Sequence, residues 1–259
     1  MNSTLQLSAA ERREHILGLI ARDRRISVSG ASQAFSISEA TARRDLEHLA
    51  RRGLIQRIHG GAIAIRRATP ESPLLERGRD QALEKERIGQ AAAGLVLEGE
   101  TVFLGSGTTV LEVAKHLRDR EKLTVITNSL PVINMFSDRP HISLVDMGGV
   151  LRTTELSFIG HITERALAEI HVDKIVIGIR GLSLEHGLTN DYLPETLTDR
   201  AILRLGGQVI IVADHAKCGT TSTAFVADLA AVHTVVTDEA TDQEFVEALS
   251  GMGIQVLRA

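Results

Sequence analysis

The segment Gly105-Ser106-Gly107-Thr108-Thr109 has the composition of an anion-binding loop. It follows the β-branched run Thr101–Leu104 and opens a helical pattern. Glycines let the backbone approach a ligand, and the free N–H groups at the start of a helix attract a phosphate. Hydroxyls of Ser and Thr add hydrogen bonds. We expect Ser106, Gly107, Thr108 and Thr109 to hold a phosphate, although an ordinary turn has the same composition.

Four later polar segments fall where other short strands are expected to end. Ligands of open parallel sheets bind beyond the carboxyl ends of the strands, so we expect these segments to meet the first loop in one crevice. The first loop lacks the G-K-[ST] ending of a Walker A motif and the G-x-G-x-x-G of dinucleotide enzymes, so no cofactor is expected. The later segments are 127–129, 148–152, 187–189 and 214–219.

The elements that position these loops alternate regularly from residue 84 onward. Short strand-like runs separated by helical patterns predict an α/β domain with a largely parallel sheet. The expected strands are Thr101–Leu104, Leu123–Thr127, Ile142–Asp146, Lys174–Ile179, Gln208–Ala213 and His233–Thr237, and the expected helices are 84–97, 109–118, 129–137, 160–170 and 195–205.

A second group of functional candidates lies near the N-terminus. Ser8 and Glu11 can form a capping box that starts a helix, Ser29–Phe35 can form a second helix, and Ser38 can cap a third that runs to about Arg52. Two helices joined by a short turn, with polar residues and arginines near the start of the second, suit insertion into a major groove of DNA.

The arginines of this third helix are Arg43 and Arg44, and Thr41 lies beside them. Arginine can bond guanine O6 and N7 together, and hydroxyls reach base edges or phosphates. The alternative is that both arginines form an exposed face that pairs with Asp45 and Glu47.

The segment 53–62 predicts a β-wing, because a short alternating strand is followed by the hairpin signal Gly60-Gly61. His59 could suggest a metal site, but neither cysteine nor a second histidine stands at ligand spacing nearby. A place in the wing is therefore the better interpretation of His59.

Charge is distributed unevenly along the 259 residues. The overall net charge is −4, yet residues 1–67 contain 12 Arg, no Lys and 6 acidic residues, whereas the remainder contains 17 basic and 27 acidic residues. A basic end suits contact with phosphate backbones, although it also occurs as ordinary solvated surface.

A single cysteine, Cys218, excludes an intramolecular disulfide framework. The N-terminus does not have the pattern of a signal peptide, and the longest apolar runs have the length of strands. We therefore expect a cytoplasmic protein that does not cross a membrane.

The chain is expected to divide into a winged helix-turn-helix domain (1–63), a linker (64–80) and an α/β domain (81–259) that binds an effector and forms oligomers. The linker contains Pro70 and Pro73, several charges and no sustained period. Such a connector is a plausible route by which the second domain sets the spacing of two DNA-binding heads.

The N-terminal motif SISEATARRDLEHLARRGLIQRIHGGAI resembles the DNA-binding signature of the DeoR family of transcriptional regulators. The later loops also resemble the effector domain of that family, which reads D-S-G-T-T, T-N-S, G-G-x-x-R, G-L-T and D-x-S-K-F-G in order. The resemblance implies DNA contacts by Ser38, Thr41, Arg43, Arg44, Arg57, His59, Gly60 and Gly61.

For the effector domain, the resemblance extends to sugar-phosphate isomerases of the ribose 5-phosphate isomerase type. It implies a phosphosugar or a similar phosphorylated metabolite as the ligand. Ser106 to Thr109 would hold the phosphate, and Asn128, Ser129, Arg152 and Lys217 are candidates for the rest of the molecule.

Departures at three places in the family pattern affect the ligand. Gly105 replaces the usual Asp, and Arg180 places a cation where a carboxylate or an amide is usual. In the E-E-A-x-x-K-R stretch, Pro194 replaces one Glu and Asp199 replaces Lys. Arg180 therefore joins the candidate effector contacts.

The sequence thus predicts a metabolite-controlled repressor of a carbohydrate-metabolism operon that binds double-stranded operator DNA as a homodimer or tetramer. An activator of the same architecture is the second hypothesis. A sugar-phosphate enzyme is a distant third, because Arg180 and Asp199 stand where an isomerase would need its base and its cation. Asp214, His215 and Lys217 form a charged group that could suggest catalysis, but a ligand-binding or salt-bridge loop is the preferred interpretation.

Overall fold

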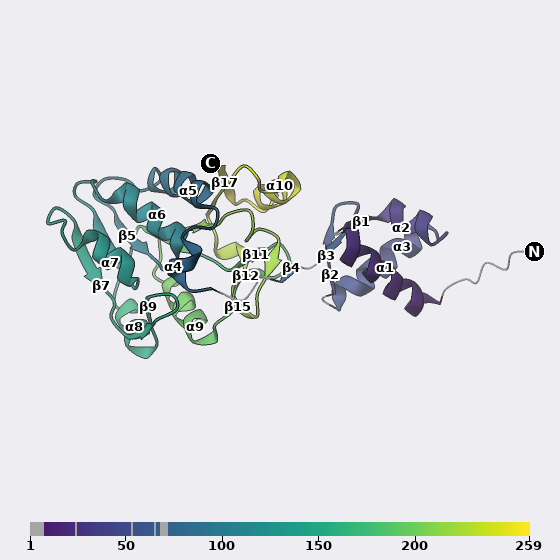
Figure 1. Ribbon diagram of the computed structural model, residues 1–259, viewed down its shortest axis with the longest axis horizontal. Coiled ribbons are helices and arrows are strands. Elements are labelled where there is room, and N and C mark those ends of the chain that lie inside the picture. Colours follow the sequence, from purple (N-terminus) through teal and green to yellow (C-terminus); the bar gives the residue numbers. More distant parts are fainter. Residues whose placement is uncertain (1–7, 24, 53, 65, 68–71) are drawn as a thin grey trace, which may run out of the picture. The chain divides into compact units, whose positions relative to one another are not determined.

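The computed structural model describes residues 8–23, 25–52, 54–64, 66–67 and 72–259 (Figure 1). The chain divides into two compact units, Met1–Arg66 and Arg67–Ala259. Within the described residues, no helix combines the length and the apolar character needed to span a membrane.

The N-terminal unit contains three helices and a small sheet, as the sequence predicts. Helix α1 starts after a capping box in which the Ser8 N–H donates to Glu11 Oε2 (2.9 Å) and the Glu11 N–H donates to Ser8 Oγ (3.3 Å). Ser38 caps α3 by accepting a hydrogen bond from the Thr41 N–H. The helices are α1 (Ala9–Asp23), α2 (Val28–Ala34) and α3 (Glu39–Arg51), and the strands are β1 (Arg25–Ser27), β2 (Ile55–Ile58) and β3 (Gly61–Ala64).

Apolar residues at helical spacing hold this unit together. Ala42, Leu46 and Leu49 of α3 are buried, as expected from the sequence, against Ile16 and Ile20 of α1. Helix α2 begins at Val28, one residue before the expected start, because Ser27 caps it through the Gly30 N–H. Gly53, the predicted stop of α3, lies outside the described residues.

The C-terminal unit is built on a seven-stranded parallel sheet of the order β17-β16-β13-β10-β5-β6-β7. The chain winds from β5 outward in one direction and then returns to β10 and winds outward in the other. The topological switch point therefore lies between β5 and β10. The strands are β5 (Thr101–Leu104), β6 (Thr124–Thr127), β7 (Ser143–Asp146), β10 (Lys174–Gly178), β13 (Gln208–Val212), β16 (Thr234–Thr237) and β17 (Gln255–Arg258).

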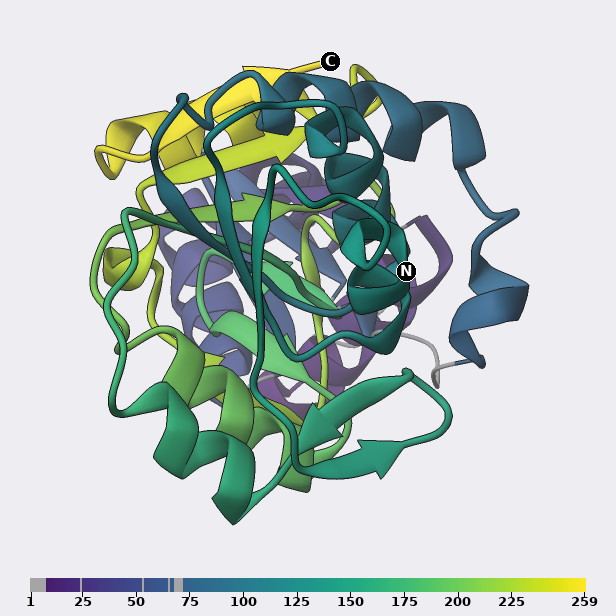
Figure 2. The same cartoon turned by 90° about the vertical axis from the view of Figure 1, so that its left-hand side faces the viewer.

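Helices cover both faces of this sheet, so the unit has three layers (Figure 2). Alternate residues of one strand enter two different cores. Val102 and Leu104 of β5 pack against the first helix group, whereas Phe103 packs with the second. The first group is α5 (Ala82–Ala93), α6 (Thr108–Leu117) and α7 (Leu130–Phe136), and the second is α8 (His161–Leu167), α9 (Leu193–Ile202) and α10 (Gln243–Gly251).

Smaller elements surround the carboxyl edge of the sheet. A hairpin of β8 and β9 and an antiparallel sheet of order β11-β12-β15 lie outside the main sheet. The remaining elements are β4 (Arg66–Arg67), α4 (Leu74–Arg77), β8 (Val150–Arg152), β9 (Ser157–Ile159), β11 (Gly181–Ser183), β12 (Gly187–Asn190), β14 (Thr220–Thr221), β15 (Ala224–Ala227) and the short 3₁₀ helix Leu229–Ala231.

The predicted α/β fold is confirmed, and all six expected strands are present in the parallel sheet. The segment 187–189 was expected to be a loop at a strand end, and this expectation is wrong because it pairs as β12 with β11 and β15. Strand β17 and helix α10 were not predicted. Of the expected linker 64–80, residues 72–80 are in the C-terminal unit, where Leu74 is buried; Pro70 lies outside the described residues.

Candidate functional site

A cavity opens at the carboxyl edge of the sheet, at the switch point. Its walls come from the ends of three neighbouring strands, from α9 and from the segment that precedes α5. Six of the predicted effector contacts line it: Ser106, Gly107, Thr108, Thr109, Arg180 and Lys217.

The loop after β5 has the geometry of an anion site. Gly105 lies so close to β10 that a Cβ there would be 2.9 Å from Ile177 Cγ2, and Gly107 has a φ of +114° that favours glycine. The first bond of α6 runs from the Leu111 N–H to Gly107 O, so the preceding N–H groups are available to a ligand. These groups and the helix dipole favour an anion at this point.

Four cations line the cavity: Arg77, Lys85, Arg180 and Lys217. The ammonium of Lys217 makes neither a hydrogen bond nor an ion pair with any described residue. Burial, followed by the neighbouring charge of Arg180, lowers the pKa of Lys217. Burial also lowers the pKa of Lys85, whose Nζ donates to Arg77 O (2.7 Å). An anionic ligand beside Lys217 would stabilise the charged form of its ammonium.

Two carboxylates of the cavity wall, Glu195 and Asp199, have partners in the protein. Glu195 accepts from Ser157 Oγ (2.7 Å) and forms an ion pair with Arg152, and Asp199 accepts from Asn190 Nδ2 (2.6 Å). These contacts fix the carboxylates, which remain able to accept hydrogen bonds from a bound hydroxyl.

Three predicted effector contacts do not line the cavity. Arg152 lies behind Glu195, with its guanidinium carbon 4.4 Å from the centre of the Tyr192 ring. Asn128 donates to Phe158 O (3.0 Å), and Ser129 is buried where its backbone bridges to Ser157. The structure therefore gives these three residues supporting places around the β8–β9 hairpin.

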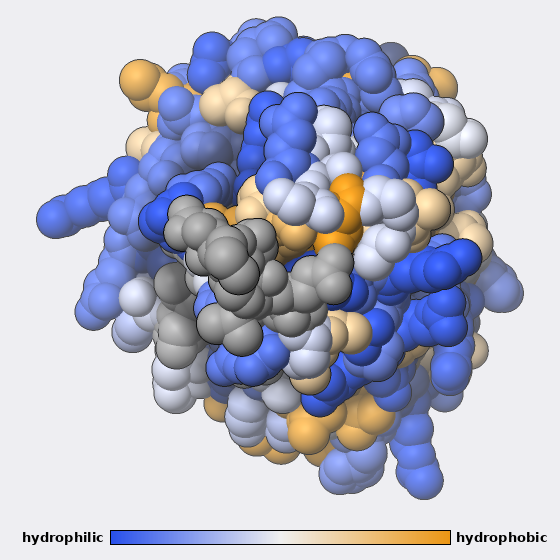
Figure 3. Space-filling model, turned by 90° about the vertical axis from the view of Figure 1, so that its right-hand side faces the viewer, coloured by the Kyte–Doolittle hydropathy of each residue, from blue (hydrophilic) through white to orange (hydrophobic). Residues whose placement is uncertain are grey.

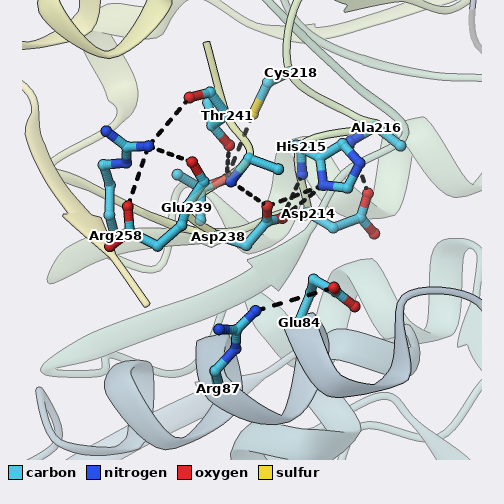
Figure 4. A network of polar contacts seen from close by, with 12 residues as sticks. Glu84, Arg87, Asp214, His215, Ala216, Cys218, Asp238, Glu239, Thr241 and Arg258 are labelled. Carbon is cyan, nitrogen blue, oxygen red and sulfur yellow. Dashed lines mark hydrogen bonds and ion pairs between the residues drawn. The ribbon is translucent and has the colours of Figure 1, made fainter. Parts of the chain in front are cut away.

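The loop after β13 separates the charged group Asp214, His215 and Lys217. Asp214 and Lys217 line the cavity, whereas the ring of His215 lies 2.9 Å from Asp238 (Figure 4). The His215 N–H also donates to Asp238, at 2.7 Å. Asp238 thus orients the loop, and His215 is not among the lining residues, which agrees with the preferred non-catalytic interpretation.

Cys218 of the same loop is also buried. Burial raises the pKa of its thiol to about 11, and its Sγ lies 3.7 Å from Thr237 Oγ1. The thiol therefore remains protonated and packs as a small apolar group.

Sequence reasoning missed two of the cavity cations, Arg77 and Lys85. Arg77 is the last residue of α4, within the expected linker, and Lys85 belongs to a helix that the sequence indicates only by its apolar period. A signal was available, because a lysine on the apolar side of an amphipathic helix requires a buried partner.

The second candidate site is the exposed start of α3 in the N-terminal unit. Ser38 and Thr41 cap the helix, with 2.9 Å between their hydroxyl oxygens. Arg43 and Arg44 are exposed. Arg43 pairs with Glu39 (3.2 Å), and Arg44 has no ion-pair partner among the described residues. The pairing with Asp45 and Glu47 that the alternative interpretation requires is absent from this part of the chain.

Asp45 serves a different purpose. Arg12 Nε and Arg13 Nε of α1 donate to its two carboxylate oxygens, at 2.6 and 2.7 Å. Burial opposes ionisation, but the two guanidinium hydrogen bonds outweigh it and hold the pKa of Asp45 below its usual value. This clamp fixes α3 against α1, and sequence reasoning missed it.

The wing forms as predicted, with β1, β3 and β2 in an antiparallel sheet. His59 and Gly60 form its exposed tip, and Gly60 has a φ of +80°. Gly61 is buried, because a Cβ there would be 2.3 Å from Ile26 O. Arg57 donates to Gly61 O and so braces the hairpin. Hydrophilic residues dominate the face drawn in Figure 3.

Comparison with known proteins finds a family match in each part of the chain. The family model of the DeoR-like helix-turn-helix domain matches residues 12–68, and that of the DeoR C-terminal sensor domain matches residues 80–239. The structure of ribose 5-phosphate isomerase from Plasmodium falciparum aligns with 52% of the chain and 52% of its own, at 14% identity and a TM-score of 0.39, a similarity too low to indicate activity.

Several curated relatives match almost from end to end. The transcriptional repressor AccR of Agrobacterium fabrum is 34% identical and covers 90% of this chain and 91% of its own. The repressor GlcR of Bacillus subtilis is 34% identical over 95% of both chains, and the glycerol-3-phosphate regulon repressor of Escherichia coli is 30% identical over 96% and 99%. The chain belongs to the DeoR family, and it is a DNA-binding transcriptional regulator with a sensor domain for a small molecule.

Proposed function

We propose that this regulator represses a carbohydrate-metabolism operon and releases its operator when a phosphorylated sugar, or a related phosphorylated metabolite, binds the C-terminal unit. The observation that carries the proposal is the cavity at the switch point, with the start of α6 and four cations on its walls. The names of the relatives support repression, since three of them are repressors.

The cavity combines the two chemistries that a phosphosugar requires. The loop 105–109 and the cations provide a place for the phosphate, whereas the fixed carboxylates of Glu195 and Asp199 can accept hydrogen bonds from sugar hydroxyls. Arg180 favours a ligand with additional negative charge or with carbonyl oxygens at its end of the cavity.

On DNA, Arg44 and the capped start of α3 would enter the major groove, and the wing tip at His59 and Gly60 would contact the backbone or the minor groove. A single winged helix offers a small contact area, so we infer that a homodimer or tetramer binds repeated half-sites. We infer that the protein acts in the cytoplasm, where its operator lies.

The test measures binding of the full-length protein to a labelled duplex from its own upstream region by fluorescence anisotropy. Random duplex at the same moderate salt is the control for non-specific affinity. We expect preference for the upstream duplex, and weaker binding in the presence of at least one member of a phosphosugar panel. Equal affinity for both duplexes would refute operator recognition, and a panel member that binds without changing operator affinity would refute the control by that ligand.

A further inference from the structure

A carboxylate of the protein lies beside the proposed phosphate site. Glu155 is in the turn between β8 and β9 and is 5% exposed. Its Oε1 is 3.8 Å from the position that a Cβ on Gly107 would have, next to the start of α6. The start of a helix attracts negative charge, and here a side chain of the same unit supplies it.

Arg77 pairs with this carboxylate and connects it to the segment that follows the linker. Arg77 Nη2 forms an ion pair with Glu155, and its Nε donates to Ser72 O at 2.9 Å. The Leu74 N–H donates to Thr154 O at 2.9 Å. We call residues 72–77 the strap. These contacts join the strap to the β8–β9 hairpin, and the ion pair lies in the cavity wall.

A phosphate at the start of α6 would disturb this arrangement. Its negative charge would lie next to Glu155, and like charges a few ångströms apart inside a protein repel strongly. The same phosphate would offer Arg77 a partner with more charge and the same two-oxygen geometry. Both effects act against the Arg77–Glu155 pair.

We propose that Glu155 occupies the anion site in place of the effector phosphate, and that Arg77 is an effector-binding residue which exchanges Glu155 for that phosphate. The exchange separates the strap from the hairpin. Because the strap lies between the DNA-binding unit and α5 in the chain, its release changes the tether of the DNA-binding unit. This inference rests on the proposed function, since it requires a phosphorylated effector.

Inorganic phosphate serves as the probe, and its binding to full-length protein is measured by isothermal titration calorimetry. Glu155→Gln removes the competing charge and keeps the shape, so it is expected to tighten phosphate binding by about tenfold, which one unit charge at close range can supply. Arg77→Gln is expected to weaken binding by a similar factor. Glu169→Gln and Arg204→Gln change the same charges at exposed positions outside the cavity and are expected to leave binding unchanged.

A measurement on the wild-type protein tests whether Arg77 changes its partner from Glu155 to phosphate, independently of how the variants fold. Hydrogen exchange followed by mass spectrometry reports on the strap, whose Leu74 N–H loses its acceptor when the strap separates. Phosphate is expected to speed exchange in the peptide 72–81 and to slow it at the start of α6. Unchanged or slower exchange in the strap at saturating phosphate would overturn the proposal.

The two levels of the proposal fail in different ways. In one outcome, phosphate binds and Gly107→Ala weakens that binding, but Glu155→Gln and Arg77→Gln behave as their exposed controls do. The anion site then stands, and the change of partner of Arg77 from Glu155 to phosphate is refuted. If neither phosphate nor any phosphosugar binds the wild type or Glu155→Gln, the proposed function fails together with the inference.

Discussion

Replacing Asp45 by Asn tests whether the clamp between α1 and α3 sustains the DNA-binding unit. The side chain of Asp45 is 2% exposed and holds Arg12 and Arg13, which are 12% and 28% exposed. Removing one partner of a buried ion pair costs about 3–5 kcal/mol. Water still reaches both arginines, so we expect a cost of about 3 kcal/mol, the lower end of that range.

That cost is large for a unit of this size. A single core in a domain of fewer than about 70 residues rarely supplies more than about 3–5 kcal/mol of stability. Asp45→Asn should therefore leave the N-terminal unit close to the midpoint of unfolding, with loss of operator binding. Hydrogen exchange in peptides from α1 and α3 measures this directly, and peptides from β5 and β10 in the same sample report on the C-terminal unit.

The matched control is Glu47→Gln, on the same helix. Glu47 pairs with Arg51 at 3.3 Å, but both side chains are mostly exposed, so its loss should cost less than about 0.5 kcal/mol. If α1 and α3 are as well protected from hydrogen exchange in Asp45→Asn as in Glu47→Gln, the clamp is refuted.

The stability lost in Asp45→Asn should depend on pH. The two arginines hold the folded-state pKa of Asp45 below its ordinary value of 3.8. The contribution of Asp45 to stability is therefore present above that value and is lost as pH falls through the lower, folded-state pKa. The stability difference between wild type and Asp45→Asn should therefore shrink as pH falls below 3.8. A difference that stays constant down to pH ~2, well below the usual aspartate pKa, would show that the pair carries no net charge effect.

Three further predictions concern single residues of the two sites. Gly107→Ala forces a φ of +114° on a residue with a Cβ, which is a strain of about 1–3 kcal/mol. It should weaken phosphate binding in calorimetry without changing operator affinity in the absence of ligand. Unchanged phosphate affinity would contradict the assignment of this loop to the phosphate. Gly61→Ala places a Cβ 2.3 Å from Ile26 O and should disrupt the wing, which would be seen as faster hydrogen exchange in β3. The control Gly18→Ala, with open space around it, should not. Equal hydrogen exchange in both variants would contradict the close approach of Gly61 to Ile26. Arg44→Ala should cost about 1–3 kcal/mol of specific operator binding in anisotropy titrations if it bonds a base, and an unchanged preference over random duplex would remove it from that role.

Local signals were sufficient to predict much of this fold. The capping box at Ser8 and Glu11 and the cap at Ser38 depend on neighbours within one turn, so the residue types determine them. The parallel strands were recognisable because both of their faces are buried, which produces the β-branched run KIVIG of β10. Strand β17 was missed because its residues are only partly buried and its run is correspondingly weak.

Long-range partners were not predictable in the same way. Arg152 was a reasonable ligand candidate from its motif, but the topology places Glu195, which is 43 positions away, against its guanidinium. Arg77 stood in a charged segment that resembled a linker, and only the fold places it over a cavity formed by loops up to 140 residues later. A charged residue type indicates that a partner is needed without indicating which one.

The two units depend on different interactions for their stability, and this makes control by the effector separable from folding. A small apolar cluster and the buried Asp45 clamp hold the N-terminal unit, whereas two large cores on either side of the sheet hold the C-terminal unit. Substitutions at the cavity, such as Glu155→Gln, touch neither the clamp nor that small cluster. If such a variant changes operator affinity while α1 and α3 keep their protection from hydrogen exchange, the change acts on a folded DNA-binding unit, because the same measurement excludes its unfolding.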